Sequence, residues 1–571
     1  MSPDVDRAWW KEASVYQVYP RSFNDSDGDG LGDIPGIRER ADYFDELGVD
    51  VVWLCPVYDS PNADMGYDIR DYRSIMDEMG TMADWEGLLD DVHDRDMKLV
   101  MDLVVNHTSD EHAWFVESRD PDGGKDDWYI WRDGGPDEPP NNWISLFGGP
   151  AWTYDERREA WYLHLFDEKQ PDLNWENPDV REAIYDMMTF WLEKGIDGFR
   201  MDAISCISKP HGLPDADTGA DWFDMDLYFN GPRIHEFMQE MAAETYENYD
   251  VMLIGETPGA DPEEAKQYYE DGVDVVVYFD HMDVTYGPGG KWSPDYVGVE
   301  TLASASDEEL DEMLNTMALA DLQEAIRHWD EGVGDEWNCL YMGSHDQTRA
   351  VSRFGDDHEY HRESATLVAT FLLTQRATPF LYQGDEIGMT NTDWDRDDIR
   401  DVEARGQVDI LTDEYDVPYE TIAPFVRNRS RDNARTPMQW DDAENAGFTD
   451  GDPWIQVNDD YDRVNVERAM ADPDSIFHYY RRLLDHRSES DVLVYGDTAY
   501  VLPDDEYPNV WAHRRTLGED SVLVVLNWQA EKRDVAGIDG VDSPVLFGNY
   551  DGQTADETTL RPYEARIYDL G

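Results

Sequence analysis

The chain has 571 residues, and its 128 acidic and 45 basic side chains give it a formal net charge of −83 at pH 7. A field of this sign and size repels nucleic acids and anionic membranes, which excludes both as partners. Aromatic residues make up 12% of the chain and lie among the acidic ones, whereas a disordered acidic tail would lack them. The sequence therefore predicts a folded protein, longer than the roughly 100–200 residues of one ordinary domain.

The small share of Lys among the basic residues, together with the negative net charge, predicts a protein adapted to concentrated salt. Only 9 of the 45 are Lys and 36 are Arg. A large net charge destabilises a compact chain by self-repulsion, and concentrated salt screens that repulsion, because the Debye length is about 3 Å at 1 M. The composition resembles that of proteins from salt-in halophiles, whose cytoplasm is itself brine. An ordinary acidic enzyme is the alternative.

Cysteine content and the N-terminal sequence predict a soluble protein of the cytoplasm. We expect it to be a monomer or a homodimer. Cys55, Cys206 and Cys339 are too few for a disulfide framework and share no metal-ligand spacing. The N-terminal residues do not show the basic region and apolar run of a signal peptide. No run approaches the eighteen apolar residues of a membrane-spanning helix.

Short β-rich apolar runs alternate with amphipathic stretches along the chain. We expect eight strands, at Val15–Tyr19, Val51–Leu54, Leu99–Val105, Gly198–Met201, Val251–Gly255, Val273–Tyr278, Cys339–Gly343 and Phe380–Tyr382. Several of these runs are continuously apolar, as in strands that are buried on both faces. Helical spacing is clear in Asp179–Lys194, which Gly195 would end. The alternation predicts an α/β fold, a (β/α)8 TIM barrel rather than an open doubly wound sheet.

Two insertions and a C-terminal region depart from this alternation. Residues 106–174 are loop-like and follow the third strand, and the highly charged residues 390–442 follow the eighth. Further apolar runs predict an antiparallel β-sandwich domain at the C-terminus: Val492–Tyr495, Val510–His513 and Val522–Asn527. We therefore expect a barrel from residues 1–105 and 175–490, an inserted domain from 106–174, and a C-terminal domain from 491–571.

Polar side chains follow several of the expected strands, where the catalytic groups of such barrels lie. They are Asp102, Asn106, His107, Arg200, Asp202, Glu256, His345 and Asp346. Each alone is compatible with a cap, a turn or a buried histidine. Several carboxylates on one face repel each other, so their collection there indicates a function.

These residues carry a family resemblance. The segments Asp102–His107 (DLVVNH), Gly198–Asp202 (GFRMD), Gly255–Thr257 (GET) and Ser344–Asp346 (SHD) resemble the four signature regions of glycoside hydrolase family 13, the α-amylase superfamily. The segment Gln170–Asn174 (QPDLN) resembles a fifth region in its oligo-1,6-glucosidase and α-glucosidase form. The resemblance runs almost from end to end and is least distinct after residue 491. It implies a barrel A, a domain B after strand three and a β-sandwich domain C.

The resemblance also implies the catalytic roles of a retaining α-glucosidase. Asp202 would be the nucleophile, Glu256 the general acid and base, and Asp346 a third carboxylate that holds sugar hydroxyls. Retaining enzymes keep the first two carboxyl groups about 5–5.5 Å apart. Arg200 lies two residues before Asp202, on the same strand face, and would keep it ionised.

Substrate-binding residues follow from the same resemblance. Asp64 and Arg431 would clamp the glucose at the non-reducing end, as exo-acting enzymes require, and Arg435 is the alternative to Arg431. The remaining candidates for this subsite are Tyr67, His107, Gln170 and His345, with Phe147 and Phe166 as aromatic walls. Core packing is an equal alternative for the two phenylalanines.

The residue after the nucleophile bears on linkage preference. In the resembling subgroup it is typically Val in α-1,6-specific enzymes and Ala or Thr in those that favour α-1,4 links or sucrose. Here it is Ala203, which predicts maltose or sucrose over isomaltose. A methyl group or two in a pocket is worth only about 1–3 kcal/mol, so one residue seldom decides specificity alone.

The segment Asp25–Asp33 (DSDGDGLGD) places carboxylates at alternate positions with glycines between them, which suits a hard cation. The family resemblance implies Ca²⁺ or Mg²⁺ bound through Asp25, Asp27, Asp29, the Leu31 carbonyl and Asp33. An EF-hand is unlikely, because its twelfth position is Gly36 and not a bidentate Glu. The alternative is a solvated acidic turn, and we expect no organic cofactor.

Related activities remain open. An oligo-1,6-glucosidase, or a glucosyl-transferring isomerase of the sucrose or trehalose type, would share the three carboxylates. A polymer-cutting α-amylase is disfavoured by domain B and the expected clamp. Non-catalytic accessory subunits of transporters in this superfamily carry a membrane helix and lack catalytic groups, whereas this sequence keeps all three carboxylates. We therefore expect a small sugar as the substrate.

Overall fold

The computed structural model describes residues 5–217, 225–286, 291, 317–501, 507–552 and 558–571. The chain divides into two compact units. Unit 1 consists of Met1–Gly32, Glu39–Val52 and Phe279–Gly571, and unit 2 of Asp33–Arg38 and Trp53–Tyr278.

Eight parallel strands form the central sheet of the barrel, in the order β11-β10-β9-β5-β2-β1-β13-β12. Their bounds are β1 Val15–Val18, β2 Val51–Leu54, β5 Lys98–Val104, β9 Gly198–Asp202, β10 Met252–Glu256, β11 Val275–Val277, β12 Cys339–Tyr341 and β13 Thr378–Tyr382. Nearly every residue in them is buried, which is why the runs read as continuously apolar. The predicted (β/α)8 barrel is confirmed, and each of the eight expected runs supplies one strand.

The helices of unit 2 include α6, which begins and ends at local sequence signals. They are α2 Ile34–Glu39, α4 Met82–His93, α5 Ala113–Ser118, α6 Pro178–Lys194, α7 Met225–Tyr228, α8 Ile234–Glu244 and α9 Pro262–Glu270. The Asn177 side chain accepts a hydrogen bond from Asp179 N at the start of α6, where Pro178 has no N–H to satisfy. Gly195 ends the same helix with a φ of 98°. The predicted helix is therefore confirmed.

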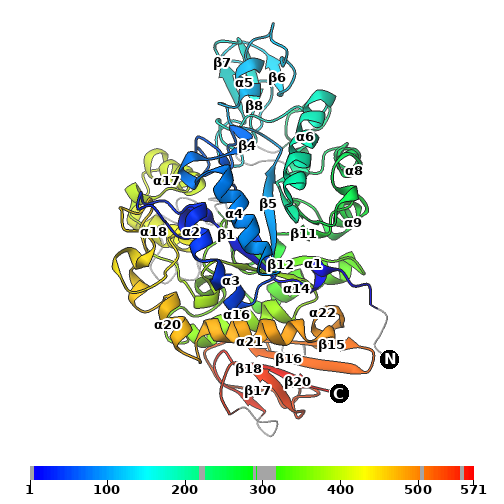
Figure 1. The fold of residues 1–571 in the computed structure, drawn as a ribbon, viewed down its shortest axis with the longest axis vertical. Helices are drawn as coiled ribbons and strands as arrows, with labels where there is room; N and C mark the ends of the chain where they lie inside the picture. Colours follow the sequence, from blue (N-terminus) through cyan, green and yellow to red (C-terminus); the bar gives the residue numbers. More distant parts are fainter. Residues whose placement is uncertain (1–4, 218–224, 287–290, 292–316, 502–506, 553–557) are drawn as a thin grey trace. The chain divides into compact units, whose positions relative to one another are not determined.

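Unit 2 also contains a small antiparallel sheet within the expected inserted domain. Its strands are β6 Trp131–Asp133, β8 Ala160–Leu163 and β7 Trp152–Asp155, in that order, drawn in cyan beside α5 in Figure 1. Trp143, Trp152 and Leu163 are buried in the core beneath it. A separate pair, β3 Tyr58–Asp59 and β4 Asp71–Ile75, precedes this sheet in the chain.

The helices of unit 1 lie along the rest of the chain, and α1 precedes β1. They are α1 Trp9–Glu12, α3 Ala41–Leu47, α10 Asp280–Asp283, α14 Leu319–Val333, α15 Ala350–Phe354, α16 His361–Thr374, α17 Val402–Asp409, α18 Tyr419–Arg429, α19 Asp432–Arg435, α20 Val466–Ala471, α21 Ile476–Ser488 and α22 Asp491–Tyr495. Helices α17 and α18 lie in the charged insertion, where Trp394, Ile399, Val408 and Val426 form a small apolar core of their own.

The C-terminal strands form two antiparallel sheets, which Figure 1 draws in orange and red beside α21. The larger contains β14 Asp497–Tyr500, β15 Val510–Leu517, β16 Asp520–Asn527, β20 Ala565–Asp569 and β18 Val545–Gly548, and the smaller β17 Arg533–Asp534 and β19 Thr559–Leu560. One expected strand is wrong, because the run from Val492 lies in helix α22. The Ser490 side chain caps that helix by accepting from Leu493 N, and only Leu493 and Val494 in it are buried.

None of the helices in the described ranges is long and apolar enough to cross a membrane. Cys55, Cys206 and Cys339 are all buried and free.

Candidate active site

Two of the predicted catalytic carboxylates stand at the ends of neighbouring strands in unit 2. Asp202 is the last residue of β9 and Glu256 the last residue of β10. The two strands are parallel, with Gly255 opposite Met201, so both side chains emerge at the same strand end. Because buried apolar residues on both strands set the pairing register, the two carboxylates are held at fixed positions along the strands.

The guanidinium of Arg200 joins these carboxylates. Its Nη1 donates to Asp102 Oδ1 at 2.8 Å and to Asp202 Oδ1 at 2.5 Å, and its Nη2 donates to Glu256 Oε1. Burial lowers the pKa of Arg200, but Glu256, Asp102 and Asp202 raise it further, so the pKa lies well above its ordinary value. Arg200 is thus a fixed positive charge shared by three acids, which we call the Arg200 cluster.

The second oxygen of Glu256 is held by the backbone. Ala203 N donates to Glu256 Oε2 at 2.7 Å. Ala203 adopts a left-handed conformation, with φ 41° and ψ 40°, which turns its N–H toward that oxygen. The conformation costs an L-residue about 1–2 kcal/mol, and more for a β-branched side chain. Ala203 therefore has a backbone role beside Glu256 that the sequence did not reveal.

Asp102 completes the cluster from β5. Its Oδ2 accepts from Trp53 Nε1 at 2.8 Å, and its carbonyl oxygen accepts from the Tyr58 hydroxyl at 2.8 Å. Burial raises the pKa of Asp102 to about 6, although Arg200 and Trp53 act in the opposite direction. Trp53 was not expected in the site, and a tryptophan inside an apolar strand carries no signal for this contact.

Three of the predicted sugar-binding residues of unit 2 form a second group. Gln170 Nε2 lies 3.1 Å from Asp64 Oδ2 and 3.0 Å from His107 Nε2. Burial lowers the pKa of His107 to about 4, so the imidazole is neutral at pH 7. Tyr67 is buried beside them and donates its backbone N–H to Asp64 O at 3.0 Å.

The two predicted aromatic walls lie near the same group. The Phe166 ring centroid is 5.0 Å from that of His107, and the Phe147 ring meets Phe166 edge-on at 5.7 Å. Both phenylalanines are partly buried. An aromatic pair beside a neutral imidazole and a carboxylate can bind both the C–H face and the hydroxyl edge of a sugar.

The remaining predicted catalytic and sugar-binding residues belong to unit 1. Asp346 Oδ1 accepts from Arg431 Nη1 at 3.2 Å and from Arg435 Nη2 at 3.1 Å, so both arginines left open by the sequence reach one carboxylate. His345 Nε2 lies 3.2 Å from Asp346 Oδ2, and its Nδ1 lies 2.6 Å from Gln17 Nε2. One third of the Asp346 side chain is exposed.

Asp401 contacts the predicted sugar-binding residue Arg431, and the sequence did not predict this contact. It is fully buried and accepts from Arg431 N at 3.0 Å and from Arg431 Nε at 2.8 Å. Burial raises the pKa of Asp401, but Arg431, Lys291 and Arg435 lower it more, so its pKa lies below the ordinary value. The only local signal is its place before α17, where its side chain accepts from Glu403 N. Many acids crowd this insertion, so that signal does not single it out.

The acidic loop of unit 1 brings three of the predicted metal ligands together. Carboxylate oxygens of Asp25, Asp27 and Asp29 all lie within 4.8 Å of one another. Asp25 also accepts from Gly30 N at 2.9 Å. Gly30 has a φ of 96°, and a Cβ there would lie 1.9 Å from Asp452 O, so only glycine fits. Oxygen donors alone suit a hard cation such as Ca²⁺ or Mg²⁺.

The other two predicted ligands have contacts of their own. Leu31 N donates to Asp29 Oδ1 at 2.8 Å, which folds the loop back on itself. Asp33 belongs to unit 2 and its Oδ1 accepts from Gly36 N at 2.6 Å in the first turn of α2.

A parallel barrel with paired carboxylates at adjacent strand ends suits a glycoside hydrolase, and comparison with known proteins gives the same class. Residues 17–496 match the family model described as "Alpha amylase, catalytic domain". An oligo-1,6-glucosidase from Parageobacillus thermoglucosidasius is 50% identical, covering 99% of this chain and 100% of that protein. An alpha-glucosidase from Pediococcus pentosaceus is 43% identical, covering 98% and 99%.

Solved structures agree on the fold. The isomaltulose synthase PalI from Klebsiella sp. LX3 has a TM-score of 0.91 and 39% identity, covering 99% of this chain and 100% of that one. The chain belongs to the α-amylase family of glycoside hydrolases.

Proposed function

We propose that this enzyme is an exo-acting retaining α-glucosidase. It would release glucose from the non-reducing end of maltose, sucrose or short malto-oligosaccharides, and prefer α-1,4 over α-1,6 links. The observation that carries this proposal is the Arg200 cluster, in which one buried guanidinium contacts Asp202 and Glu256 together. A nucleophile and an acid held side by side are what double displacement requires.

In the first step, Asp202 attacks the anomeric carbon of the glucosyl group while Glu256 gives its proton to the glycosidic oxygen. The bond to the leaving sugar breaks, and a β-glucosyl ester of Asp202 forms. Arg200 supports this step because its charge keeps Asp202 ionised until the ester forms. The glycosidic oxygen leaves as a neutral hydroxyl, so no alkoxide has to be stabilised.

In the second step, Glu256 takes a proton from water, which attacks the same carbon and expels Asp202 as a carboxylate. Two inversions restore the α configuration and return Glu256 to its protonated form. Asp64, Gln170 and His107 would bind the hydroxyl groups of the glucose. Asp346 and Arg431 would complete that binding, with Asp346 favouring the distorted ring of the transition state.

Linkage preference is tested at Ala203. A valine there would place two further methyl groups on a residue whose φ is 41°, so both the shape beside the next sugar and the hold on Glu256 would change. We expect Ala203→Val to shift the ratio of kcat/KM on maltose and isomaltose toward isomaltose by about tenfold. Ala203→Gly is the control, because it relieves the left-handed strain without adding volume. A wild-type enzyme that prefers isomaltose would contradict the proposal.

The relatives favour a second candidate, an oligo-1,6-glucosidase, since that is the name of the 50% identical protein. A glucosyl-transferring isomerase is the third, by similarity to isomaltulose synthase. The products formed from concentrated sucrose distinguish a hydrolase from a glucosyl-transferring isomerase. Glucose and fructose released in equal amounts support hydrolysis, whereas a disaccharide isomer of sucrose as the main product supports transfer.

We also propose that the acidic loop binds a structural Ca²⁺ or Mg²⁺ through Asp25, Asp27 and Asp29, with the Leu31 carbonyl and Asp33 as the other predicted ligands. The bound cation would neutralise neighbouring carboxylates and hold the loop folded. Chelation should then lower the unfolding temperature, because a ligand at 100 times its Kd stabilises by about 2.7 kcal/mol. Asp27→Asn with Asp29→Asn should abolish the effect of the chelator, and the exposed Asp42→Asn should leave it intact.

Finally, we propose that the enzyme works in the cytoplasm of a salt-in halophile. The support is the net charge of −83, which molar salt would screen. Activity and unfolding temperature should rise together as KCl increases from dilute buffer to several molar. Full activity and stability in dilute buffer would refute this proposal.

A further inference from the structure

Two cavities of unit 1, each of about 350 Å³, carry opposite charges. The first has five acids and one base in its wall: Glu39, Arg40, Asp42, Glu46, Asp441 and Glu467. The second has three bases and two acids: Arg396, Asp397, Arg400, Arg405 and Asp409. The first follows the acidic excess of the whole chain, nearly three acids for every base, whereas bases outnumber acids in the second. We call the second the arginine cavity.

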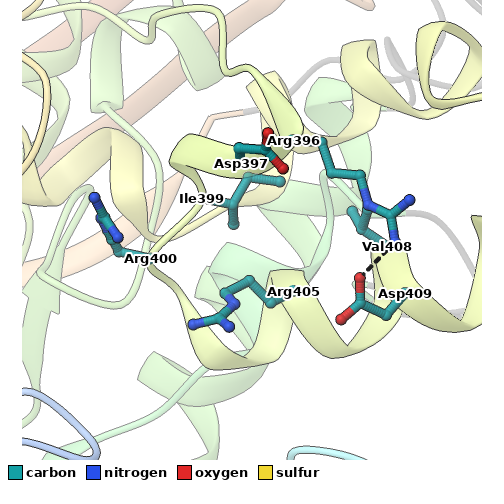
Figure 2. Close-up of a pocket in the computed structure, with 7 residues that line it drawn as sticks. All are labelled: Arg396, Asp397, Ile399, Arg400, Arg405, Val408 and Asp409. Carbon is teal, nitrogen blue, oxygen red and sulfur yellow. Dashed lines mark hydrogen bonds and ion pairs between the residues drawn. The ribbon is translucent and has the colours of Figure 1, made fainter.

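The three arginines of this cavity are not equivalent. Arg396 Nη2 donates to Asp409 Oδ1 at 2.8 Å and to Asp413 Oδ1 at 3.0 Å, and Figure 2 marks its pair with Asp409. Arg400 and Arg405 are exposed, and within the described ranges neither guanidinium has a hydrogen-bonding or ion-pairing partner. Acids outnumber bases so heavily in this chain that two unpaired arginines in one cavity need an explanation.

The backbone that carries these arginines is well anchored. Arg400 N donates to Asp432 Oδ2 at 2.8 Å, and the next residue, Asp401, caps α17. Ile399 and Val408, which also line the cavity, are buried in the local apolar core. The cavity wall is therefore part of the packed insertion, and the two guanidinium groups extend from a fixed frame (Figure 2).

We propose that the arginine cavity binds a phosphate group, either as inorganic phosphate or as part of a sugar phosphate. Arginine presents a planar fork of donors that matches phosphate oxygens two at a time, and a dianion would neutralise Arg400 and Arg405 together. A volume of about 350 Å³ lies in the range of small-molecule sites. Asp397, also in the wall, would favour a ligand with hydroxyl groups to donate.

The proposal is independent of the glucosidase activity, so binding tests it directly. Calorimetric titration of the full chain at one fixed KCl concentration would use inorganic phosphate and glucose 6-phosphate as probes. We expect saturable binding of both to the wild type, and affinity at least tenfold weaker in the double variant Arg400→Gln with Arg405→Gln. If glucose 6-phosphate binds more tightly and loses that advantage in the variant, the source is a sugar phosphate. Equal affinities identify inorganic phosphate.

Two further double variants separate a built site from bulk charge. Arg463→Gln with Arg468→Gln removes the same charge from exposed arginines outside the cavity, and should leave phosphate affinity unchanged. Arg400→Lys with Arg405→Lys keeps the charge, removes the planar forks and should weaken binding several-fold, even if the glutamine variant does not fold. The proposal is overturned if the wild type shows no saturable phosphate binding. It is also overturned if both glutamine double variants weaken binding equally, or if the lysine variant binds as the wild type does.

Discussion

Two fully buried aspartates, Asp102 in unit 2 and Asp401 in unit 1, each bind an arginine, yet their pKa values are shifted in opposite directions. The pKa of Asp102 is raised to about 6, whereas the pKa of Asp401 lies below its ordinary value. Burial raises both, so the difference comes from the neighbouring charges. Asp102 shares Arg200 with two other carboxylates, and Asp401 is surrounded by several cations.

The opposite pKa shifts predict different roles for the Arg200 cluster and for the residues around Asp401. In the Arg200 cluster, three carboxylates share one guanidinium, and the pKa of Asp102 lies near neutral pH. A carboxyl group there can gain or lose a proton at little cost in free energy, which suits acid–base chemistry. Around Asp401, the cations hold the carboxylate ionised, and the ionised carboxylate fixes Arg431. We infer that the first region carries chemistry and that the second positions a binding group. Three predictions, made with four substitutions, test this division.

The largest effect is expected at the two carboxylates that we propose are catalytic. Asp202→Asn removes the nucleophile and should lower kcat by about 10⁴-fold, and Glu256→Gln removes the acid and should lower it by about 10²–10⁴-fold. Both should leave the unfolding temperature within a few degrees of the wild type. Steady-state kinetics on maltose measure the loss, with the exposed Asp186→Asn as the control. A Glu256→Gln variant with normal activity would show that Glu256 is not the general acid.

A smaller effect is expected in the pH dependence of stability, from Asp102. Its folded pKa of about 6 exceeds the unfolded value of about 3.9, so the folded state keeps a proton that the unfolded state releases. Stability is therefore lost as pH rises from about 4 to 6, by about 3 kcal/mol in total. Asp102→Asn should flatten this part of the profile of unfolding free energy against pH.

Urea unfolding at several pH values measures the profile, and the exposed Asp90→Asn is the matched control. A variant as steep as the wild type between pH 4 and 6 would show that Asp102 does not titrate in that range. The pKa values of Asp102 and Asp401 would then not be shifted in opposite directions.

The smallest effect is expected at Asp401. Asp401→Asn keeps a hydrogen-bond acceptor but removes the charge that holds Arg431, so the arginine should be less well placed. We expect KM for maltose to rise by about tenfold, equivalent to about 1.4 kcal/mol, with kcat changed much less. Asp398→Asn, an exposed acid in the same insertion, should behave as the wild type. A fall in kcat with KM unchanged would give Asp401 a part in the chemistry instead.

Much of the fold could be predicted because its signals are local. The eight barrel strands are runs of buried residues, and a strand covered on both faces reads as apolar without reference to any partner. Asn177 and Gly195 mark the two ends of α6 in the same way. The run from Val492 was ambiguous for a related reason, because four apolar residues fit a helix as well as a strand. The Ser490 cap and burial decided in favour of the helix.

The residues of the site also differ in whether local sequence could predict them. Asp202 and Glu256 could be named from the sequence because each follows a recognisable strand within a family motif. Only the tertiary structure decided what surrounds them: Arg200 shared among three acids, Ala203 N on Glu256, and Asp401 beneath Arg431. Strand ends are a property of neighbours in the chain, whereas the charge balance around a buried group depends on residues far apart in it. For that reason the net charge of −83, which is a sum over the whole chain, could not predict the two places where arginines set the local charge balance.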